Sequence, residues 1–254
     1  MPEVVIVASA FGAEAIRRDG HQNWLKAAAD AGATGFEVRR ELFATDDDAT
    51  PRALGALADA LDAHGLWSVY STPDALYHAD GSLDEAALDR ALAEARTLGA
   101  RYVKLQLGGF AGRAYGEAIV ARTAGAAVRL VVENGQLKQG GTLAQFTGLF
   151  GALRDEGHPG ALGMTFDIGN WQWPGEAPLD AARALAPQVE YIHCKAVRGS
   201  GARLFAVAPD ADDPVCAAVL PLLPRNVPRG IEFPFDSTRV AADAARYVAW
   251  LAAA

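Results

Sequence analysis

Four residues with side chains able to bind a metal or transfer a proton follow short apolar runs in this chain. The clearest is Asp167, which ends the apolar run 161–166. Asp is unfavourable inside a strand, so at the exit of a buried strand its carboxylate is expected to face a pocket. Runs of the same form end in Glu133, His193 and Glu232. This pattern indicates a site where carboxylates and an imidazole hold a metal ion or move a proton.

The four residues indicate a functional site only if their side chains lie close together in the folded chain. A lone Glu at a strand end is more often an ion-pair partner, and a lone His is more often a hydrogen-bonded buried group. Three carboxylates and one imidazole at four successive strand ends would instead repel one another strongly without a cation. Oxygen-rich ligation with one imidazole suits Mn²⁺, Mg²⁺ or Co²⁺, with Zn²⁺ as an alternative. We therefore predict one divalent metal ion, bound by Glu133, Asp167, His193 and Glu232.

Other polar and aromatic residues at strand ends are predicted to contact a substrate. The cationic side chains among them could bind a substrate carboxylate or phosphate, or could pair with neighbouring acids. An aromatic face suits the CH faces of a sugar, although packing at the barrel rim is the alternative. The predicted contacts are Glu37, Arg39, Lys104, Asn170, Trp171 and Lys195.

The elements that must position these residues alternate regularly between strand and helix. Ser82 and Glu85 form a capping-box pattern before the third helix. The strands are expected at 4–8, 35–39, 66–70, 101–107, 129–133, 161–167, 189–193 and 230–233. The helices are expected at 22–31, 51–64, 83–98, 115–124, 142–154, 179–186, 214–223 and 238–251.

Eight strand-then-helix units in 254 residues predict a single (β/α)₈ TIM barrel over residues 1–254. The strands lack clean alternation, as expected when both faces are covered. An open doubly wound sheet is the alternative, but neither GxGxxG after the first strand nor GxxxxGK[ST] is present. In a barrel, polar residues at the C-terminal ends of strands usually belong to the active site.

Composition restricts the partners and the compartment. The formal net charge of −8 disfavours nucleic acid, because phosphate binding needs a basic surface. No segment approaches the roughly 20 apolar residues of a membrane span, and the N-terminus has no secretory signal pattern. The two cysteines, Cys194 and Cys216, favour a reducing compartment. We expect a cytoplasmic protein without a membrane partner.

Several segments together resemble the xylose isomerase-like TIM barrels, also called the AP endonuclease family 2 superfamily. That superfamily contains sugar phosphate isomerases and epimerases, ketose 3-epimerases, inosose-processing enzymes, 3-dehydroshikimate dehydratases and endonuclease IV. The likeness spans nearly the whole chain, and no single motif is specific. Its segments are GFEVRRE, YVKLQLG, VVENGQ, MTFDIGNWQW, YIHCKAV and GIEFPF.

The resemblance implies a metal-dependent isomerase or epimerase of a hydroxyketone sugar or sugar acid. Glu133 and Glu232 would then act as acid and base on opposite faces of the substrate, through an enediolate. A lyase of the 3-dehydroshikimate dehydratase kind and a non-catalytic barrel that binds a sugar or metal remain alternatives. The partner would be a small sugar or keto acid, and the resemblance also allows a homo-oligomer.

Two departures from the family's patterns bear on nucleic acid. Asn170 stands where the family often has the His of DxxH, and an Asn cannot replace that His as a ligand of a second metal. Ala196 stands where many relatives have the Asp of His-x-Lys-Asp. Both losses argue against a three-zinc nuclease, so no DNA substrate is expected.

Overall fold

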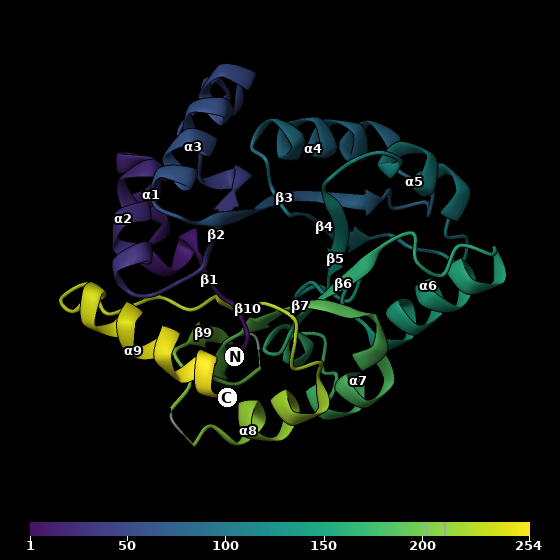
Figure 1. Ribbon diagram of the computed structural model, residues 1–254. Coiled ribbons are helices and arrows are strands. Elements are labelled where there is room, and N and C mark those ends of the chain that lie inside the picture. The colour runs from purple at the N-terminus through teal and green to yellow at the C-terminus, as the bar shows by residue number, and fades with distance from the viewer. Residues whose placement is uncertain (202, 211) are drawn as a thin grey trace.

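Eight parallel strands form a closed barrel, which confirms the predicted (β/α)₈ fold (Figure 1). The computed structural model describes residues 1–201, 203–210 and 212–254. Around the barrel the strand order is β1-β10-β7-β6-β5-β4-β3-β2. The strands are β1 (Val4–Val7), β2 (Gly35–Arg39), β3 (Trp67–Tyr77), β4 (Tyr102–Gly108), β5 (Arg129–Glu133), β6 (Gly163–Asp167), β7 (Val189–Cys194) and β10 (Arg229–Ile231).

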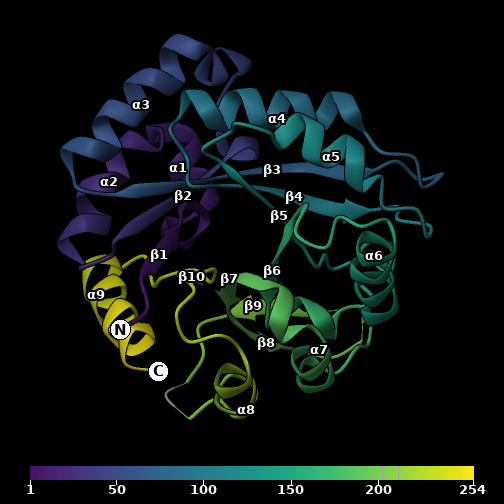
Figure 2. The same ribbon diagram turned by 45° about the vertical axis from the view of Figure 1, so that its right-hand side comes forward.

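Helices surround the ring of strands, and the chain runs once around it, so that α9 closes beside β1 (Figures 1 and 2). The sequence prediction missed α1. The helices are α1 (Ala13–Asp19), α2 (Gln22–Asp30), α3 (Pro51–Ala63), α4 (Glu85–Thr97), α5 (Gly116–Thr123), α6 (Leu143–Asp155), α7 (Pro178–Leu185), α8 (Pro214–Val219) and α9 (Val240–Ala253).

Burial of both strand faces explains why the strands read as continuous apolar runs. All four residues of β1 and all five of β6 are buried. One face of each strand points into the barrel and the other packs against the helices, so period-2 alternation is lost. This core holds the C-terminal ends of the strands at one rim of the barrel.

Local capping explains where several helices begin. Thr50 caps α3: its side chain accepts a hydrogen bond from the Ala53 amide, and Pro51 occupies the first helical position. The predicted capping box at the start of α4 is wrong. Asp84, not Ser82, caps that helix by accepting from the Ala87 amide, because the helix begins at Glu85, directly after Asp84.

Three strand assignments differ from the sequence prediction. β3 continues to Tyr77, with a register shift against β4 between Ser71 and Ala75. The stretch after β7, predicted as irregular, contains an antiparallel hairpin of β8 (Ala196–Arg198) and β9 (Phe205–Val207). β10 is short and ends at Ile231, so Glu232 follows the strand and its amide donates to the Cys194 carbonyl.

Within the residues that the structure describes, no helix has the length and apolarity needed to cross a membrane. Cys194 and Cys216 are both buried free thiols.

Candidate metal centre

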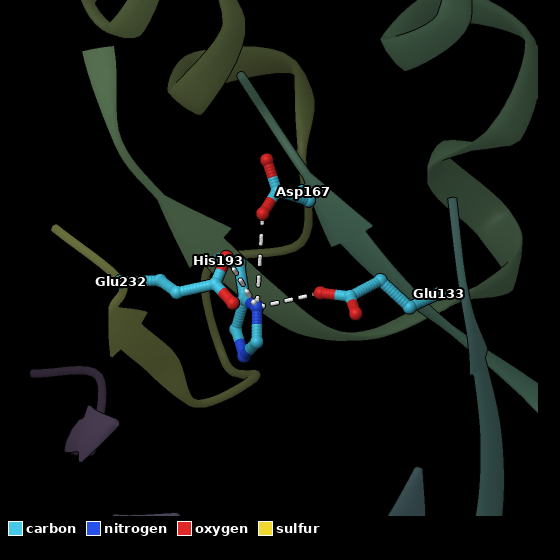
Figure 3. Close-up of side chains that lie close together, drawn as sticks. All are labelled: Glu133, Asp167, His193 and Glu232. Carbon is cyan, nitrogen blue, oxygen red and sulfur yellow. Dashed lines mark ion pairs between the residues drawn. The ribbon is translucent and has the colours of Figure 1, made fainter. Parts of the chain in front are cut away.

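The four predicted ligands meet at the C-terminal rim of the barrel (Figure 3). One ligand atom from each of Glu133, Asp167, His193 and Glu232 lies within 4.8 Å of all the others. From His193 Nδ1 the distance is 2.7 Å to Glu133, 3.2 Å to Glu232 and 3.7 Å to Asp167. Figure 3 shows the two glutamates on opposite sides of the imidazole. The group therefore has the donor set and spacing of a site for a single cation.

Strand register produces this convergence. Asp167 on β6 pairs directly with His193 on β7, and Gly230 on β10 pairs with the same His193. Parallel strands end at the same rim, so residues that end neighbouring strands face one pocket. Gly230 is required here, because a Cβ at this position would lie 2.5 Å from the Tyr191 hydroxyl and 2.8 Å from His193 Cδ2.

The orientation of His193 is fixed from behind by Glu37 on β2. Glu37 Oε2 lies 2.8 Å from His193 Nε2, and the Tyr191 hydroxyl donates to the same oxygen at 3.0 Å. A carboxylate at this distance accepts a hydrogen bond from Nε2–H. In the neutral imidazole the lone pair is therefore on Nδ1. That lone pair then points at the other three ligands, as a metal-binding histidine requires.

Three of the converging atoms are in ion-pair contact but make no hydrogen bond of good geometry among the described residues. They are Glu133 Oε1, Asp167 Oδ2 and His193 Nδ1, all buried. Buried polar atoms are normally hydrogen-bonded, and exceptions need an explanation. Three carboxylates around one imidazole concentrate negative charge, which a proton on Nδ1 or a divalent cation would offset, so the residues present fit such a cation.

Lys104 on β4 neutralises one side of the site. Its ammonium lies 2.8 Å from Glu133 Oε2 and 3.1 Å from Glu37 Oε1. Gln106 adds a hydrogen bond of 2.9 Å to the same Glu133 oxygen. Because Lys104 is fully buried, it holds the two glutamates in place and leaves Glu133 Oε1 directed at the cluster.

Lys195 and Arg39 neutralise the other side. Lys195 lies 2.8 Å from Asp167 and 2.7 Å from Glu232, so it also contributes positive charge close to the ligands. Arg39 contacts Glu232 at 2.6 Å and Glu41 at 2.6 Å.

The charges of the cluster decide the pKa of its imidazole. Burial and the Lys104 charge act to lower the pKa of His193, but the carboxylates of Glu37, Glu232 and Glu133 raise it well above its ordinary value. Burial acts to raise the pKa of Glu37, yet Lys104 and His193 lower it to about 2. The acids thus stay ionised, and the site attracts a positive charge at its centre.

Asp167 behaves differently from the glutamates. Burial raises the pKa of Asp167 to about 6, with Glu232 adding to the effect and Lys195 opposing it. Burial also acts to raise the pKa of Glu232, but Lys195 and His193 bring it well below its ordinary range. Burial is thus the main cause of the raised pKa of Asp167, and the neighbouring Glu232 carboxylate adds a repulsion that a divalent cation would relieve.

Asn134 and Asn170 hold the ends of β5 and β6 together. Asn134 donates to the Asp167 carbonyl at 3.0 Å and accepts from the Asp167 amide at 2.9 Å. Asn170 donates to the Asn134 carbonyl and accepts from Gln136, and its amide donates to Asp167 Oδ1. The Asn170 side chain is therefore used in positioning Asp167.

The structure corrects the predicted role of Trp171. This residue is fully buried and packs edge-on against Phe146 and beside Phe166, so it contacts the core and we do not propose it as a substrate contact. Trp173 lies nearer the site, with its ring centre 5.9 Å from the Lys195 ammonium. The Trp171 side chain therefore packs in the core. The sequence had left packing and substrate contact as alternatives.

Sequence reasoning missed Tyr191 and Glu41. Tyr191 precedes His193 by two positions on β7, and residues at this spacing share one strand face. That spacing was the available signal for its contact with Glu37. Glu41 follows β2 and lies beside Arg39 only because the turn after the strand folds back, which a linear pattern does not show.

The fold and the cluster define a TIM barrel with a candidate metal site at the C-terminal ends of its strands. Residues 25–252 match the xylose isomerase-like TIM barrel family, and the chain belongs to that family. A search of curated protein sequences found no significant match.

Solved structures with this fold include enzymes of different kinds. A D-psicose 3-epimerase is 13% identical, with a TM-score of 0.66 and 98% of each chain covered. A probable 3-DHS dehydratase from Bacillus anthracis is 15% identical, with a TM-score of 0.61 and 98% of each chain covered. Endonuclease IV from Thermus thermophilus is 22% identical, with a TM-score of 0.63 and 100% of each chain covered. At these identities the similarity establishes the fold only.

Proposed function

We propose that the protein is a divalent-metal-dependent isomerase or epimerase of a hydroxyketone sugar or sugar acid. The observation that carries the proposal is the convergence of one ligand atom from each of Glu133, Asp167, His193 and Glu232 within 4.8 Å of one another. The family contributes the reaction class, and its epimerase neighbour acts on a ketose according to its printed name.

The two glutamates are suited to proton transfer from two sides. Glu133 extends from β5 and Glu232 follows β10, and they approach the centre from opposite directions (Figure 3). A divalent ion held by the four ligands would supply positive charge that polarises a substrate carbonyl and acidifies the adjacent carbon-bound proton. One glutamate then removes that proton, and the other returns a proton to the opposite face.

The remaining polar residues divide into two roles in this proposal. Glu37 and Lys104 are fully buried and position His193 and Glu133. Arg39 and Lys195 contact Glu232 and are the candidates for binding an anionic or hydroxyl group of the substrate. Manganese, magnesium or cobalt suits this donor set best, and zinc is the alternative.

Elemental analysis tests the metal site. Protein purified without chelator should contain about one divalent ion per chain, and Asp167→Ala should lose most of it. Asp155→Ala, which changes an exposed acid on α6, is the matched control and should retain the ion. Full metal content in the Asp167 variant would remove Asp167 from the site.

Deuterium exchange tests the chemistry. In D₂O the metal-loaded enzyme should incorporate deuterium at the carbon beside the carbonyl of its substrate, detected by mass spectrometry. Glu133→Gln and Glu232→Gln should each fold and lose activity by roughly 10²-fold or more, as the loss of a general acid or base does. If no ketose or keto acid acquires label with loaded protein, the non-catalytic binding barrel becomes the better interpretation.

A dehydratase-like lyase is the second candidate function. Arg39 and Lys195, which contact Glu232, would suit an anionic keto acid, and a probable 3-DHS dehydratase shares the fold. A lyase would expel water and give an unsaturated product with altered ultraviolet absorbance. An epimerase would give a product of the same mass as the substrate. Mass analysis of the product therefore distinguishes a lyase from an epimerase.

A further inference from the structure

Arg229, at the start of β10, is a buried cation without an anionic partner. Its side chain is 1% exposed, and its Nη1 donates to the Leu251 carbonyl at 3.0 Å. Its Nε has no hydrogen-bond partner, and no carboxylate of the described residues lies within ion-pair distance of the guanidinium. Buried charges are normally paired, so this arginine needs an explanation.

The end of α9 offsets part of the charge. Leu251 lies in the last turn of that helix, where carbonyls lack helical partners and the helix dipole is negative. Arginine has five N–H groups, however, and this contact uses one of them. A helix end alone therefore leaves the guanidinium undersatisfied.

A cavity is lined in part by Arg229. It has a volume of about 270 Å³ and is situated between α8 and α9, whose facing ends are visible in Figures 1 and 2. Arg225, an exposed residue of the preceding loop, adds a second cation. Trp250 and Leu220 supply apolar walls. The cavity thus combines two guanidinium groups with an apolar surface.

The acid in the cavity wall does not neutralise these arginines. Asp213 Oδ1 accepts hydrogen bonds from the amides of Val215 and Cys216 at the start of α8. Its other oxygen is 3.9 Å from Arg198. Ala254, the last residue of the sequence, also lines the cavity. Even so, no ion pair holds Arg225 or Arg229 among the residues that the structure describes, so both guanidinium groups are free to pair with a ligand.

We propose that this cavity binds a small organic monocarboxylate. The carboxylate pairs with Arg229 and Arg225, because a guanidinium matches a carboxylate in a bidentate geometry. The apolar body of the ligand lies against Trp250 and Leu220. The site is separate from the metal centre, since Arg229 begins β10 and Glu232 follows its opposite end. The proposal does not depend on the reaction at that centre.

Calorimetric titration of the full chain with sodium benzoate tests the proposal, with chelator present to remove metal. Benzoate should bind saturably at one site per chain and raise the midpoint of thermal unfolding. The neutral analogue benzamide should not bind. Inorganic phosphate is titrated in a separate experiment. A protein that binds phosphate but does not bind benzoate would overturn the assignment of an organic acid.

Substitutions of single arginines test whether benzoate binds in this cavity. Arg229→Met should weaken benzoate binding at least tenfold while the circular dichroism spectrum is unchanged. Arg225→Gln changes an exposed residue that the fold does not need, and it should weaken binding several-fold. Arg52→Gln, an exposed arginine on α3, should bind as the wild type does. Undiminished binding in the Arg225 variant, or in a folded Arg229 variant, would overturn the proposal, as would no binding to the wild type.

Discussion

At the scale of single residues, the contact between Glu37 and His193 determines whether the cluster can bind a metal. Glu37 lies on β2, on the far side of the imidazole from the other three acids. By accepting at Nε2 it leaves Nδ1 as the metal-facing lone pair. Carboxylates placed behind a histidine ligand in this way orient the ring and increase its basicity.

Replacing Glu37 by Gln should weaken metal binding without unfolding the barrel. The substitution keeps the size of the side chain but removes the charge behind His193, so metal affinity should fall roughly 10–100-fold. Competition with a chelating dye measures this change. Glu190→Gln is the control, because Glu190 pairs with Arg129 away from the cluster. Equal affinity in wild type and the Glu37 variant would show that the contact does not orient the ligand.

At the scale of elements, helix α6 supports the 3₁₀ helix Asn170–Gln172, which follows Asp167 at the end of β6. Thr142 and Gln145 form a capping box at the start of this helix. Phe146 then packs against Trp171, which lies in the short 3₁₀ helix after β6. The cap thus stabilises α6, and α6 packs against the 3₁₀ helix that follows Asp167.

Thr142→Ala should destabilise the protein by about 1 kcal/mol, within the range for removal of an N-cap side chain. Chemical denaturation measures the free energy of unfolding. Thr147→Ala in the same helix is a matched control, since Thr147 is exposed and bonds only to carbonyls of the preceding turn. That control should be neutral or slightly stabilising. A loss of equal size in both variants would argue against the capping contribution.

At the scale of the whole molecule, the charge balance opposes binding to nucleic acid. The net charge is −8, and the cations of the candidate site are held in ion pairs with its own acids. Despite the shared fold with endonuclease IV, we expect no cleavage of DNA with abasic sites. A gel-shift assay at low salt should show no tight, salt-sensitive complex. A tight complex would restore the nuclease alternative.

Stability of the whole molecule should depend on pH through His21. Burial lowers the pKa of His21 to about 4, and its Nε2 accepts a hydrogen bond from the Arg39 amide. Between pH 6.5 and pH 4 the unfolded chain takes up a proton that the folded chain does not. The free energy of unfolding should therefore fall by up to about 1.4 kcal/mol per pH unit as pH decreases through this range.

Denaturation curves at pH 7.5 and 5.5 check this dependence. In His21→Gln the difference between the two pH values should shrink, because the titrating group is gone. His64→Gln, at an exposed position after α3, should retain the wild-type difference. An unchanged difference in the His21 variant would assign the pH dependence to other groups.

The sequence by itself determined the alternation of strands and helices, and with it the barrel. It also indicated Glu133, Asp167, His193 and Glu232 as one group, because a closed parallel barrel collects the ends of its strands at one rim. Strand ends are recognisable locally, since an apolar run stops where a polar residue begins. For that reason the four residues could be predicted without knowing any distance.

Only the tertiary structure decided how each side chain is used. Tyr191 and Glu37 meet across 154 positions of the chain, and Trp171 is a core residue because Phe146 and Phe166 surround it. The choice of Asp84 over Ser82 as a helix cap likewise depended on where the helix begins in the folded chain. A sequence pattern specifies the strand or helix that a residue occupies, but hydrogen bonds and packing between distant segments depend on separations of a few ångströms, which only the folded chain fixes.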